Sequence, residues 1–429
     1  MRGEPHTARG RELFDWVFRN SVVLAAAQGV TAVSILATVS VLSRGLSVPG
    51  FAAYAVSQSI VTIIGFFSGC GIPVLLVRDG AGRPASVVGD TWMLVIIRAV
   101  IMTGVAGAIT AWLVLATSEG EAVWLWAGAA AAGIVTSADL MHVCDAAGVA
   151  RLQGYAQAVR YGISALCMVL GYRIGSRGLA LAELTCATQV AVAVLYVWIQ
   201  WRWLRALIST PTASPCRNLG KLLRGGLPFL TLSGASTLLE RGDVALAAYR
   251  LSPELTANYA AAAQLVIGLR TLVSPLQRTS FAALSASARE SEVAVRRTAR
   301  VVGTAGVALG TVILIAGEWA ARPVVTGVYG IQYIGSVVVV RVLLLQLVVG
   351  TASFVFGQQL IALGHERVVQ RAIVVSTVLA AGCAYVLSGL FGPVGIAISM
   401  AASMLLVASW TAAALASKRA SVVSPACAG

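Results

Sequence analysis

Charged and titratable side chains interrupt the long apolar stretches of this sequence, and these are the residues with which the chain could do chemistry. They are Arg98, Asp139, His142, Asp145, Arg160, Glu183, Glu240, Arg241, Asp243, Arg270, Arg278 and Arg341. An ionisable group that faces lipid costs several kcal/mol, so such groups usually face a protein interior or a water-filled cavity. We therefore expect the functional site among them.

Asp139 and His142 are three residues apart, which places them on one face if this segment is helical. A carboxylate beside an imidazole can exchange a proton near neutral pH, so the pair could form a proton relay. The alternative is a hydrogen-bonded packing pair. A single histidine with no second one in reach is a poor metal site, and neither a metal nor another cofactor is expected.

Glu240 and Asp243 are also three residues apart, and they flank Arg241. This cluster could be a structural ion-pair group that nearly neutralises itself or pairs with another helix. It could equally be a charge switch whose partners change as two halves of a transporter move, because transport needs groups that interact differently in its two states.

Arg98 and Arg270 have no acidic residue within four positions on either side. A guanidinium stays charged at any working pH, and its fork of donors matches phosphate oxygens. We expect these two arginines to share a cavity and hold a diphosphate, with Arg241 as a third substrate-binding residue. The alternative is that they pair with Asp139, Glu183 or Asp243, or reach to the membrane interface.

The composition places these groups in a membrane. Of the 429 residues, 58% are hydrophobic and 11% are charged, whereas soluble domains carry roughly 25% charged residues. Between Arg371 and Lys418 lie 46 residues without charge, enough for two membrane-spanning helices of about 20 residues each. A soluble enzyme, a secreted protein and a disordered chain are excluded.

Apolar stretches bounded by charges, Gly or Pro predict an all-α polytopic membrane protein with twelve spans. These are expected at 20–43, 50–77, 86–116, 121–147, 153–172, 178–200, 225–248, 257–284, 301–320, 335–361, 372–389 and 395–416. With the N-terminus inside, the inner segments carry twenty Lys and Arg residues and the outer segments five. This bias predicts a cytoplasmic membrane protein with both termini in the cytoplasm. Topology thus accounts for the net charge of +14, and no nucleic-acid partner is expected.

The longest polar stretch divides these spans into two bundles of six. The expected organisation is a cytoplasmic or interfacial segment (1–19), an N-terminal bundle (20–200), a cytoplasmic linker (201–224), a C-terminal bundle (225–416) and a cytoplasmic tail (417–429). Residues 11–19 form either an amphipathic helix on the inner leaflet or the cytoplasmic end of the first span.

A short pattern recurs at the second helix of each half and predicts a parallel repeat. Its members are Pro49, Tyr54 and Gln58 in the first half and Pro253, Tyr259 and Gln264 in the second. In the same two helices, Pro73 follows a Gly-Cys-Gly sequence and Pro275 lies in mid-helix. Helices broken in matching positions are the best sequence indication of a transport pathway.

The sequence contains none of the P-loop, HExxH or GxSxG motifs and no glycine-rich nucleotide turn, so no enzyme is expected. A membrane glycosyltransferase or polymerase is the weaker alternative, since the acidic pair nearest an outer surface is Glu119 and Glu121.

Several motifs together resemble Wzx-type polysaccharide flippases of the multidrug/oligosaccharidyl-lipid/polysaccharide (MOP) exporter superfamily. They are Gln28-Gly29, Leu42-Ser43-Arg44, Phe51-Ala52-Ala53-Tyr54, Gly71 with Arg78, Arg241-Gly242-Asp243 and Asn258-Tyr259-Ala260-Ala261-Ala262. The resemblance implies two six-helix bundles around a central cavity and alternating access. The implied substrate is an undecaprenyl-diphosphate-linked oligosaccharide, and a polysaccharide polymerase and export proteins are implied partners. A small-molecule or drug antiporter of the same superfamily is the main alternative, and a scaffold without transport is a third.

The distribution of basic residues generates a topology prediction. Reporter fusions after Arg83, Lys221, Arg300 and Arg371 should report the cytoplasm, and fusions near Glu119, Arg177 and Pro253 should report the outside. An external signal at Lys221 would contradict the six-plus-six division.

Overall fold

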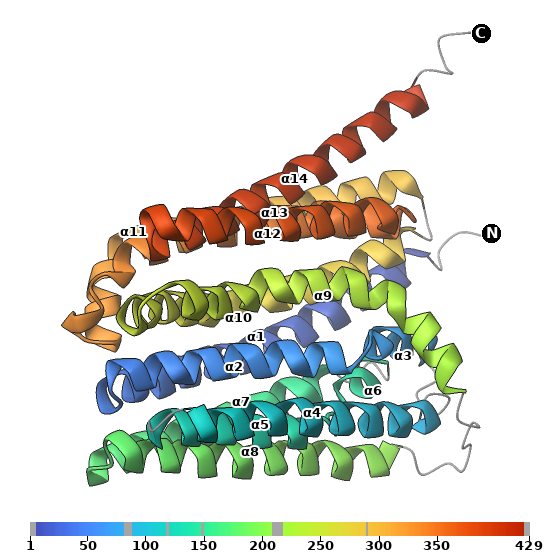
Figure 1. Cartoon of the computed structure of the whole chain (residues 1–429). Coiled ribbons are helices and arrows are strands. Elements are labelled where there is room, and N and C mark those ends of the chain that lie inside the picture. Colours follow the sequence, from blue (N-terminus) through green and yellow to red (C-terminus); the bar gives the residue numbers. More distant parts are fainter. Residues whose placement is uncertain are drawn as a thin grey trace.

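The computed structural model describes residues 6–80, 88–116, 120–146, 150–207, 218–288 and 291–423. Every regular element in these ranges is helical, which confirms the all-α prediction. Figure 1 shows the helices lying side by side in one bundle. At one edge lie α11–α14, then α9 and α10, then α1 and α2, and at the other edge α4, α5, α7 and α8.

Each of the twelve predicted spans has a helix in the structure, and two of them are divided in two. The helices are α1 (His6–Gly45), α2 (Val48–Ser68), α3 (Ile72–Gly80), α4 (Val88–Ala116), α5 (Gly120–Thr136), α6 (Met141–Ala146), α7 (Ala150–Ile174), α8 (Gly178–Leu207), α9 (Leu219–Arg250), α10 (Pro253–Ala288), α11 (Glu292–Val328), α12 (Ser336–Ala362), α13 (Glu366–Phe391) and α14 (Pro393–Val423), with a short 3-10 turn, η2 (Ile331–Tyr333), before α12. The second predicted span corresponds to α2 and α3, and the fourth to α5 and α6.

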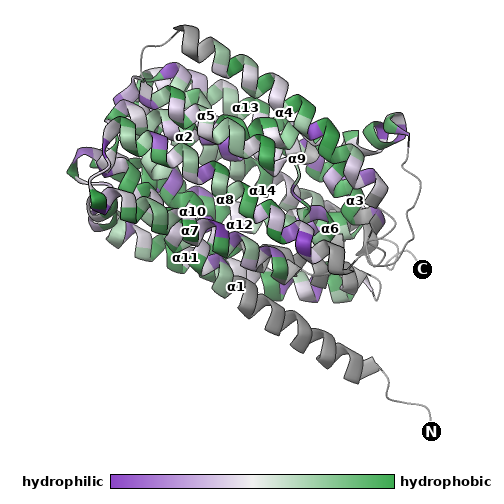
Figure 2. Ribbon diagram, turned by 90° about the horizontal axis from the view of Figure 1, so that it is seen from below, coloured by the Kyte–Doolittle hydropathy of each residue, from purple (hydrophilic) through white to green (hydrophobic). Residues whose placement is uncertain are grey.

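Large apolar side chains cover much of the outer surface, as expected of a protein in lipid. Within the described residues, eight helices are long and apolar enough to cross a membrane. On α11, for example, Val312, Ile315 and Trp319 are 62%, 56% and 85% exposed. Figure 2 shows hydrophobic residues, in green, along the helices. The chain is therefore a polytopic membrane protein.

Several helices extend beyond the predicted spans. α8 continues to Leu207 and α9 begins at Leu219, so both flanks of the expected linker 201–224 are helical, while 208–217 lie outside the described residues. α1 is one unbroken helix from His6 to Gly45, which favours the continuous first span over a separate interfacial helix. The prediction ended spans at charged residues, but Lys, Arg and Glu are good helix formers outside the membrane.

The two predicted helix breaks have different outcomes. α2 ends at Ser68, and Cys70 and Gly71 have φ values of +50° and +72°, so the chain leaves the helix through the left-handed region before Pro73 enters the first turn of α3. α10, in contrast, is helical throughout, so the break expected at Pro275 is wrong. A membrane helix tolerates proline when its surroundings satisfy the freed backbone group.

At one end of the bundle, the end of α1 contacts the segment that joins α11 to α12. The Ser40 hydroxyl donates to the Val328 carbonyl at 2.6 Å, and the Gln332 side-chain amide donates to the Ser43 carbonyl at 3.1 Å. The buried Phe51 ring lies 5.4 Å from the Tyr333 ring. These contacts connect helices that the sequence assigns to different halves.

At the opposite end, the α2–α3 turn approaches the start of α9 so closely that only glycine fits. A Cβ atom on Gly71 would lie 2.1 Å from the carbonyl oxygen of Gly226, and a Cβ on Gly226 would lie 2.4 Å from that of Cys70. Backbone therefore contacts backbone here. The predicted halves meet at both ends of the bundle, and the division into 20–200 and 225–416 stays a prediction.

Gly226→Ala should force the α2–α3 turn and α9 apart, because the added methyl has no room. We expect the free energy of unfolding in detergent to fall by about 1–3 kcal/mol, the usual cost of overpacking, and labelling of the Cys70 thiol by a maleimide to accelerate. Gly104→Ala in α4 is the control, since a Cβ there meets nothing within 4 Å. Equal melting and labelling of the two variants would contradict the close contact.

Candidate functional site

Two arginines from different helices line one cavity in the middle of the bundle. Arg160 of α7 and Arg241 of α9 face a cavity of about 150 Å³, which α1, α2, α8 and α10 complete. We call it the arginine cavity. Its other polar lining residues include Tyr54, Gln58, Thr62, Tyr161, Gln189 and Gln264.

The arginine cavity is electropositive. No Asp or Glu is among its described lining residues, and no ion pair joins Arg160 or Arg241 to a described carboxylate. The Arg160 guanidinium lies over aromatic rings instead, 5.1 Å from the centre of Tyr196 and 5.6 Å from that of Tyr161. The buried Asp243 carboxylate, two positions along α9, is in electrostatic reach of Arg241 but forms no ion pair with it. Guanidinium groups whose donors are not taken by a carboxylate are suited to bind the oxygens of a phosphate or another anion.

Arg241 was expected to bind substrate, but the sequence did not single out Arg160 as its companion. Both residues lie in apolar stretches of the sequence, and so do four other arginines. The signal that distinguishes Arg160 is its position on α7 opposite α9, which only the packing of the helices provides.

Asp243 is buried and has its own hydrogen-bond partners. The Tyr259 hydroxyl donates to Asp243 Oδ2 at 2.7 Å, and the Val244 amide donates to Oδ1 at 2.8 Å. The carboxylate lines a small cavity of about 20 Å³ between α9, α10 and α12. Tyr259 thus satisfies a carboxylate that would otherwise be costly to bury.

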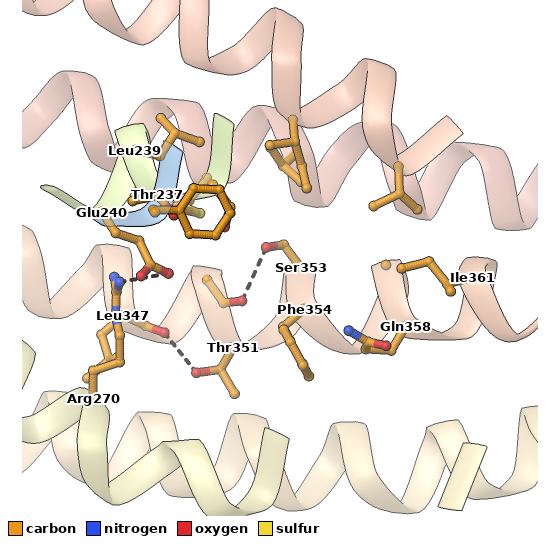
Figure 3. Close-up of a pocket in the computed structure, with 18 residues that line it drawn as sticks. Thr237, Leu239, Glu240, Arg270, Leu347, Thr351, Ser353, Phe354, Gln358 and Ile361 are labelled. Carbon is orange, nitrogen blue, oxygen red and sulfur yellow. Dashed lines mark hydrogen bonds and ion pairs between the residues drawn. The ribbon is translucent and has the colours of Figure 1, made fainter. Parts of the chain in front are cut away.

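Glu240 and Arg270 form an ion pair at one end of a larger cavity. Glu240 Oε1 lies 3.1 Å from Arg270 Nη1, and the two side chains are 45% and 24% exposed. The cavity, of about 400 Å³, lies between α9, α10, α12, α13 and α14. Figure 3 shows the pair at one end and Gln358 and Ile361 toward the other. We call it the ion-pair cavity.

The cluster Glu240-Arg241-Asp243 is therefore not self-neutralised. Glu240 pairs with Arg270, Asp243 pairs with Tyr259, and Arg241 faces the arginine cavity. Adjacent helix positions point about 100° apart, so this short segment of α9 lines three neighbouring cavities. Whether Asp243 and Glu240 act as a charge switch stays a prediction.

The structure does not bring Arg98 and Arg270 together. Arg270 lines the ion-pair cavity, whereas Arg98 of α4 lines neither of the two larger cavities. The ionisable groups in electrostatic reach of Arg98 are Asp139, which the sequence offered as an alternative partner, His142 and Tyr196. Arg270 pairs with Glu240 of α9. The expected shared cavity is therefore not found among the described cavities, and a diphosphate-binding role of either arginine stays a prediction.

Asp139 and His142 do not share a helical face. The segment from Ser137 to Leu140 is a turn and a break between α5 and α6, and Asp139 Oδ1 accepts a hydrogen bond from the Met141 amide at 2.8 Å. His142 Nε2 lies 3.3 Å from Thr91 Oγ1 instead. The proton relay between the two residues loses its geometric basis.

Side chains from α8 hold this break. Gln200 Oε1 accepts from the Leu140 amide at 2.9 Å, and Trp201 Nε1 donates to the Ala138 carbonyl at 3.1 Å. The Tyr196 hydroxyl lies 3.4 Å from Asp139 Oδ2. The sequence analysis missed these residues. In the part of the chain that the structure describes, no group of three or more His, Cys, Asp or Glu residues could hold a metal ion.

The sequence matches no protein-family model and no curated protein. The structure, in contrast, is similar to solved transporter structures over nearly its whole length. One is described as the inward-facing conformation of a multidrug resistance MATE family transporter of the MOP superfamily (TM-score 0.61, 15% identity, covering 92% of this chain and 94% of that one). Another is the outward-facing conformation of such a transporter (TM-score 0.56, 16% identity, covering 94% and 95%). The chain has the MATE transporter fold.

A third structure with the MATE fold is a MOP superfamily transporter from Pyrococcus furiosus. It is described by a reverse polarity of its binding pocket that suggests a different function (TM-score 0.56, 14% identity, covering 93% and 95%). The likeness confirms that this chain shares the fold of the superfamily expected from its motifs. At such identities the MATE fold alone is shown, and the flippase subtype stays a prediction.

Tyr259→Phe removes the hydroxyl that donates to Asp243 and keeps the ring. A hydrogen bond to a charged acceptor contributes about 1.5–3 kcal/mol, so we expect the free energy of unfolding in detergent to fall by about that amount. Combining it with Asp243→Asn in a double-mutant cycle should reveal strong coupling. Tyr249→Phe on α9, the helix that carries Asp243, is the control, because Tyr249 is 77% exposed. Additive effects would show that the pair does not interact.

Proposed function

We propose that this protein is a membrane transporter that works by alternating access, not an enzyme. The observation that supports this best is the MATE fold, which extends over 92% of the chain and is known in an inward-facing and an outward-facing form. The arginine cavity lies where α1, α2, α7 and α8 meet α9 and α10. A cavity between two groups of helices is where a transported molecule would bind.

The arginine cavity favours a substrate with an anionic group. Two guanidinium groups that form no ion pair with a described carboxylate are costly in a membrane interior, and a bound anion would offset that cost. The diphosphate of a polyprenyl-linked oligosaccharide, the substrate implied by the motif resemblance, has this chemistry. We place the protein in the cytoplasmic membrane with both termini inside, where such a substrate would be presented, and a polymerase would consume the product.

Pocket polarity is a reasonable criterion for the substrate of this fold. The neighbour from Pyrococcus furiosus is described as having a binding pocket of reverse polarity, from which a different function was suggested. The absence of acids from the described lining of the arginine cavity is the corresponding feature of this chain.

The second candidate is a cation-coupled antiporter of small molecules. Two of the similar structures are described as multidrug resistance transporters. This observation favours drug transport over transport of a lipid-linked oligosaccharide. Glu240 and Asp243 would then bind the coupling cation or a cationic drug. This candidate does not explain why no Asp or Glu is among the described lining residues of the arginine cavity.

Arg160→Gln and Arg241→Gln should each weaken binding of farnesyl diphosphate to the protein in lipid nanodiscs. Losing one charged partner in a low-dielectric site costs about 2–5 kcal/mol, which is roughly a thirtyfold loss of affinity or more. Arg341→Gln is the control, because Arg341 pairs with Glu318 and lines neither cavity. Titration calorimetry measures the affinities.

The same proteins in vesicles distinguish the two candidates. The anionic substrate predicts that the parent flips a labelled lipid diphosphate and that both cavity variants lose this activity. If all variants bind farnesyl diphosphate like the parent, and the parent instead expels an organic cation in exchange for protons or Na⁺, the antiporter is correct.

A further inference from the structure

The wall of the ion-pair cavity presents hydrogen-bond acceptors. The Thr351 hydroxyl donates to the Leu347 carbonyl at 2.9 Å and the Ser353 hydroxyl donates to the Gly350 carbonyl at 3.2 Å, as Figure 3 shows. Their protons are therefore used within α12, and their oxygen lone pairs remain. Gln358 Oε1 is buried without any hydrogen-bond partner. Buried polar atoms are rarely left unsatisfied, so this wall indicates a ligand that donates hydrogen bonds.

The charge of the cavity favours an uncharged ligand. The positive charge of Arg270 is matched by Glu240, and no other charged residue is among the described lining residues. A cation would be repelled by the neighbouring arginine cavity, and an anion would compete with Glu240 for Arg270. Hydroxyl groups satisfy the acceptors without adding charge, and because a hydroxyl both donates and accepts, it suits the Gln358 amide in either orientation.

The apolar surface of the cavity suits a ring. Phe66 from α2 and Phe354 from α12 line the cavity, and the flat faces of aromatic rings pack against apolar surfaces of a ligand.

The ion-pair cavity and the arginine cavity are neighbours along one path. Leu239, Glu240 and Arg270 line both the ion-pair cavity and the small cavity at Asp243. Ile267 lines both that small cavity and the arginine cavity. The small cavity, of about 20 Å³, and the side chains around it separate the two larger ones. One extended molecule with its charged group at Arg160 and Arg241 and another part beside Gln358 therefore requires these side chains, the Glu240–Arg270 pair among them, to move aside.

We propose that the ion-pair cavity binds the uncharged, hydroxyl-bearing part of the transported molecule, a sugar ring, and that Gln358 is the residue that selects it. The sugar hydroxyls donate to Gln358 Oε1 and to the Thr351 and Ser353 oxygens, and a Phe66 or Phe354 ring covers an apolar face of the sugar. This inference rests on the proposed anion site in the arginine cavity, since the same molecule occupies both.

The experiment compares two probes that differ by one sugar: farnesyl diphosphate, and farnesyl diphosphate that carries one N-acetylglucosamine. Binding to the full-length protein in lipid nanodiscs is measured by titration calorimetry. We expect the parent to bind the sugar-bearing probe more tightly. Gln358→Met should lower the affinity for that probe about fivefold or more, the loss of at least one neutral hydrogen bond, and leave farnesyl diphosphate binding unchanged.

Two further variants make the result specific. Gln359→Met is the matched control, because Gln359 is buried beside Gln358 but does not line the cavity, and it should bind both probes like the parent. Thr351→Val keeps the side-chain shape and removes one acceptor, so it should weaken binding of the sugar-bearing probe alone. It replaces Gln358→Met as the test variant if Gln358→Met does not fold.

Equal affinities of the parent for the two probes would overturn the inference while the anion site stands. The inference would also be overturned if Gln358→Met or Thr351→Val still bound the sugar-bearing probe more tightly than farnesyl diphosphate by the same factor as the parent. It would be overturned as well if either variant lost affinity for both probes equally. If the parent binds neither probe, the proposed function fails, and the inference fails with it.

Discussion

A charge in the interior of a membrane protein needs a partner, and this constraint decides how the helices of this chain meet. Asp243 is satisfied by Tyr259 from the next helix, and Glu240 by Arg270. Each pairing joins α9 to α10, so the contacts that stabilise these charged groups also fix the two helices against one another. Among the described residues, Arg160 and Arg241 form no ion pair with a carboxylate, and a ligand is expected where a buried charge lacks such a partner.

The same constraint applies to the backbone, because lipid offers no hydrogen bonds to a broken helix. At the break between α5 and α6, α8 supplies the missing partners through Gln200 and Trp201. At the break between α2 and α3, the turn lies directly against the backbone of α9. Irregular backbone is thus found where another helix covers it. The two breaks lie in the half of the chain that also supplies Arg160.

The helices could be predicted from sequence because hydrophobic length is a local property. The break after Ser68 could also be predicted, since Gly71 and Pro73 mark it. The break after Thr136 has no glycine or proline to mark it. Side chains of α8, distant in the sequence, hold it, so the sequence analysis missed it.

The site was harder to predict because pairing between helices is not a local property. Arg98 and Arg270 have no acid nearby on their own helices, but in the folded chain Glu240 of α9 pairs with Arg270, and Asp139 in the α5–α6 break is in electrostatic reach of Arg98. Arg241 lines the arginine cavity, and its expected role in substrate binding stays a prediction. Arg160 was seen as one of several arginines within spans, and nothing in the sequence shows that α7 places it across from α9.

The clamp on the α5–α6 break also has a consequence for the order in which the protein is made. Gln200 follows Leu140 by 60 residues, so the ribosome finishes the break well before it finishes the side chain that satisfies it. Until α8 has been made, the Leu140 amide and the Ala138 carbonyl lack these two partners, and buried backbone groups without partners are costly. The packed form of the break therefore depends on α8 lying against α5.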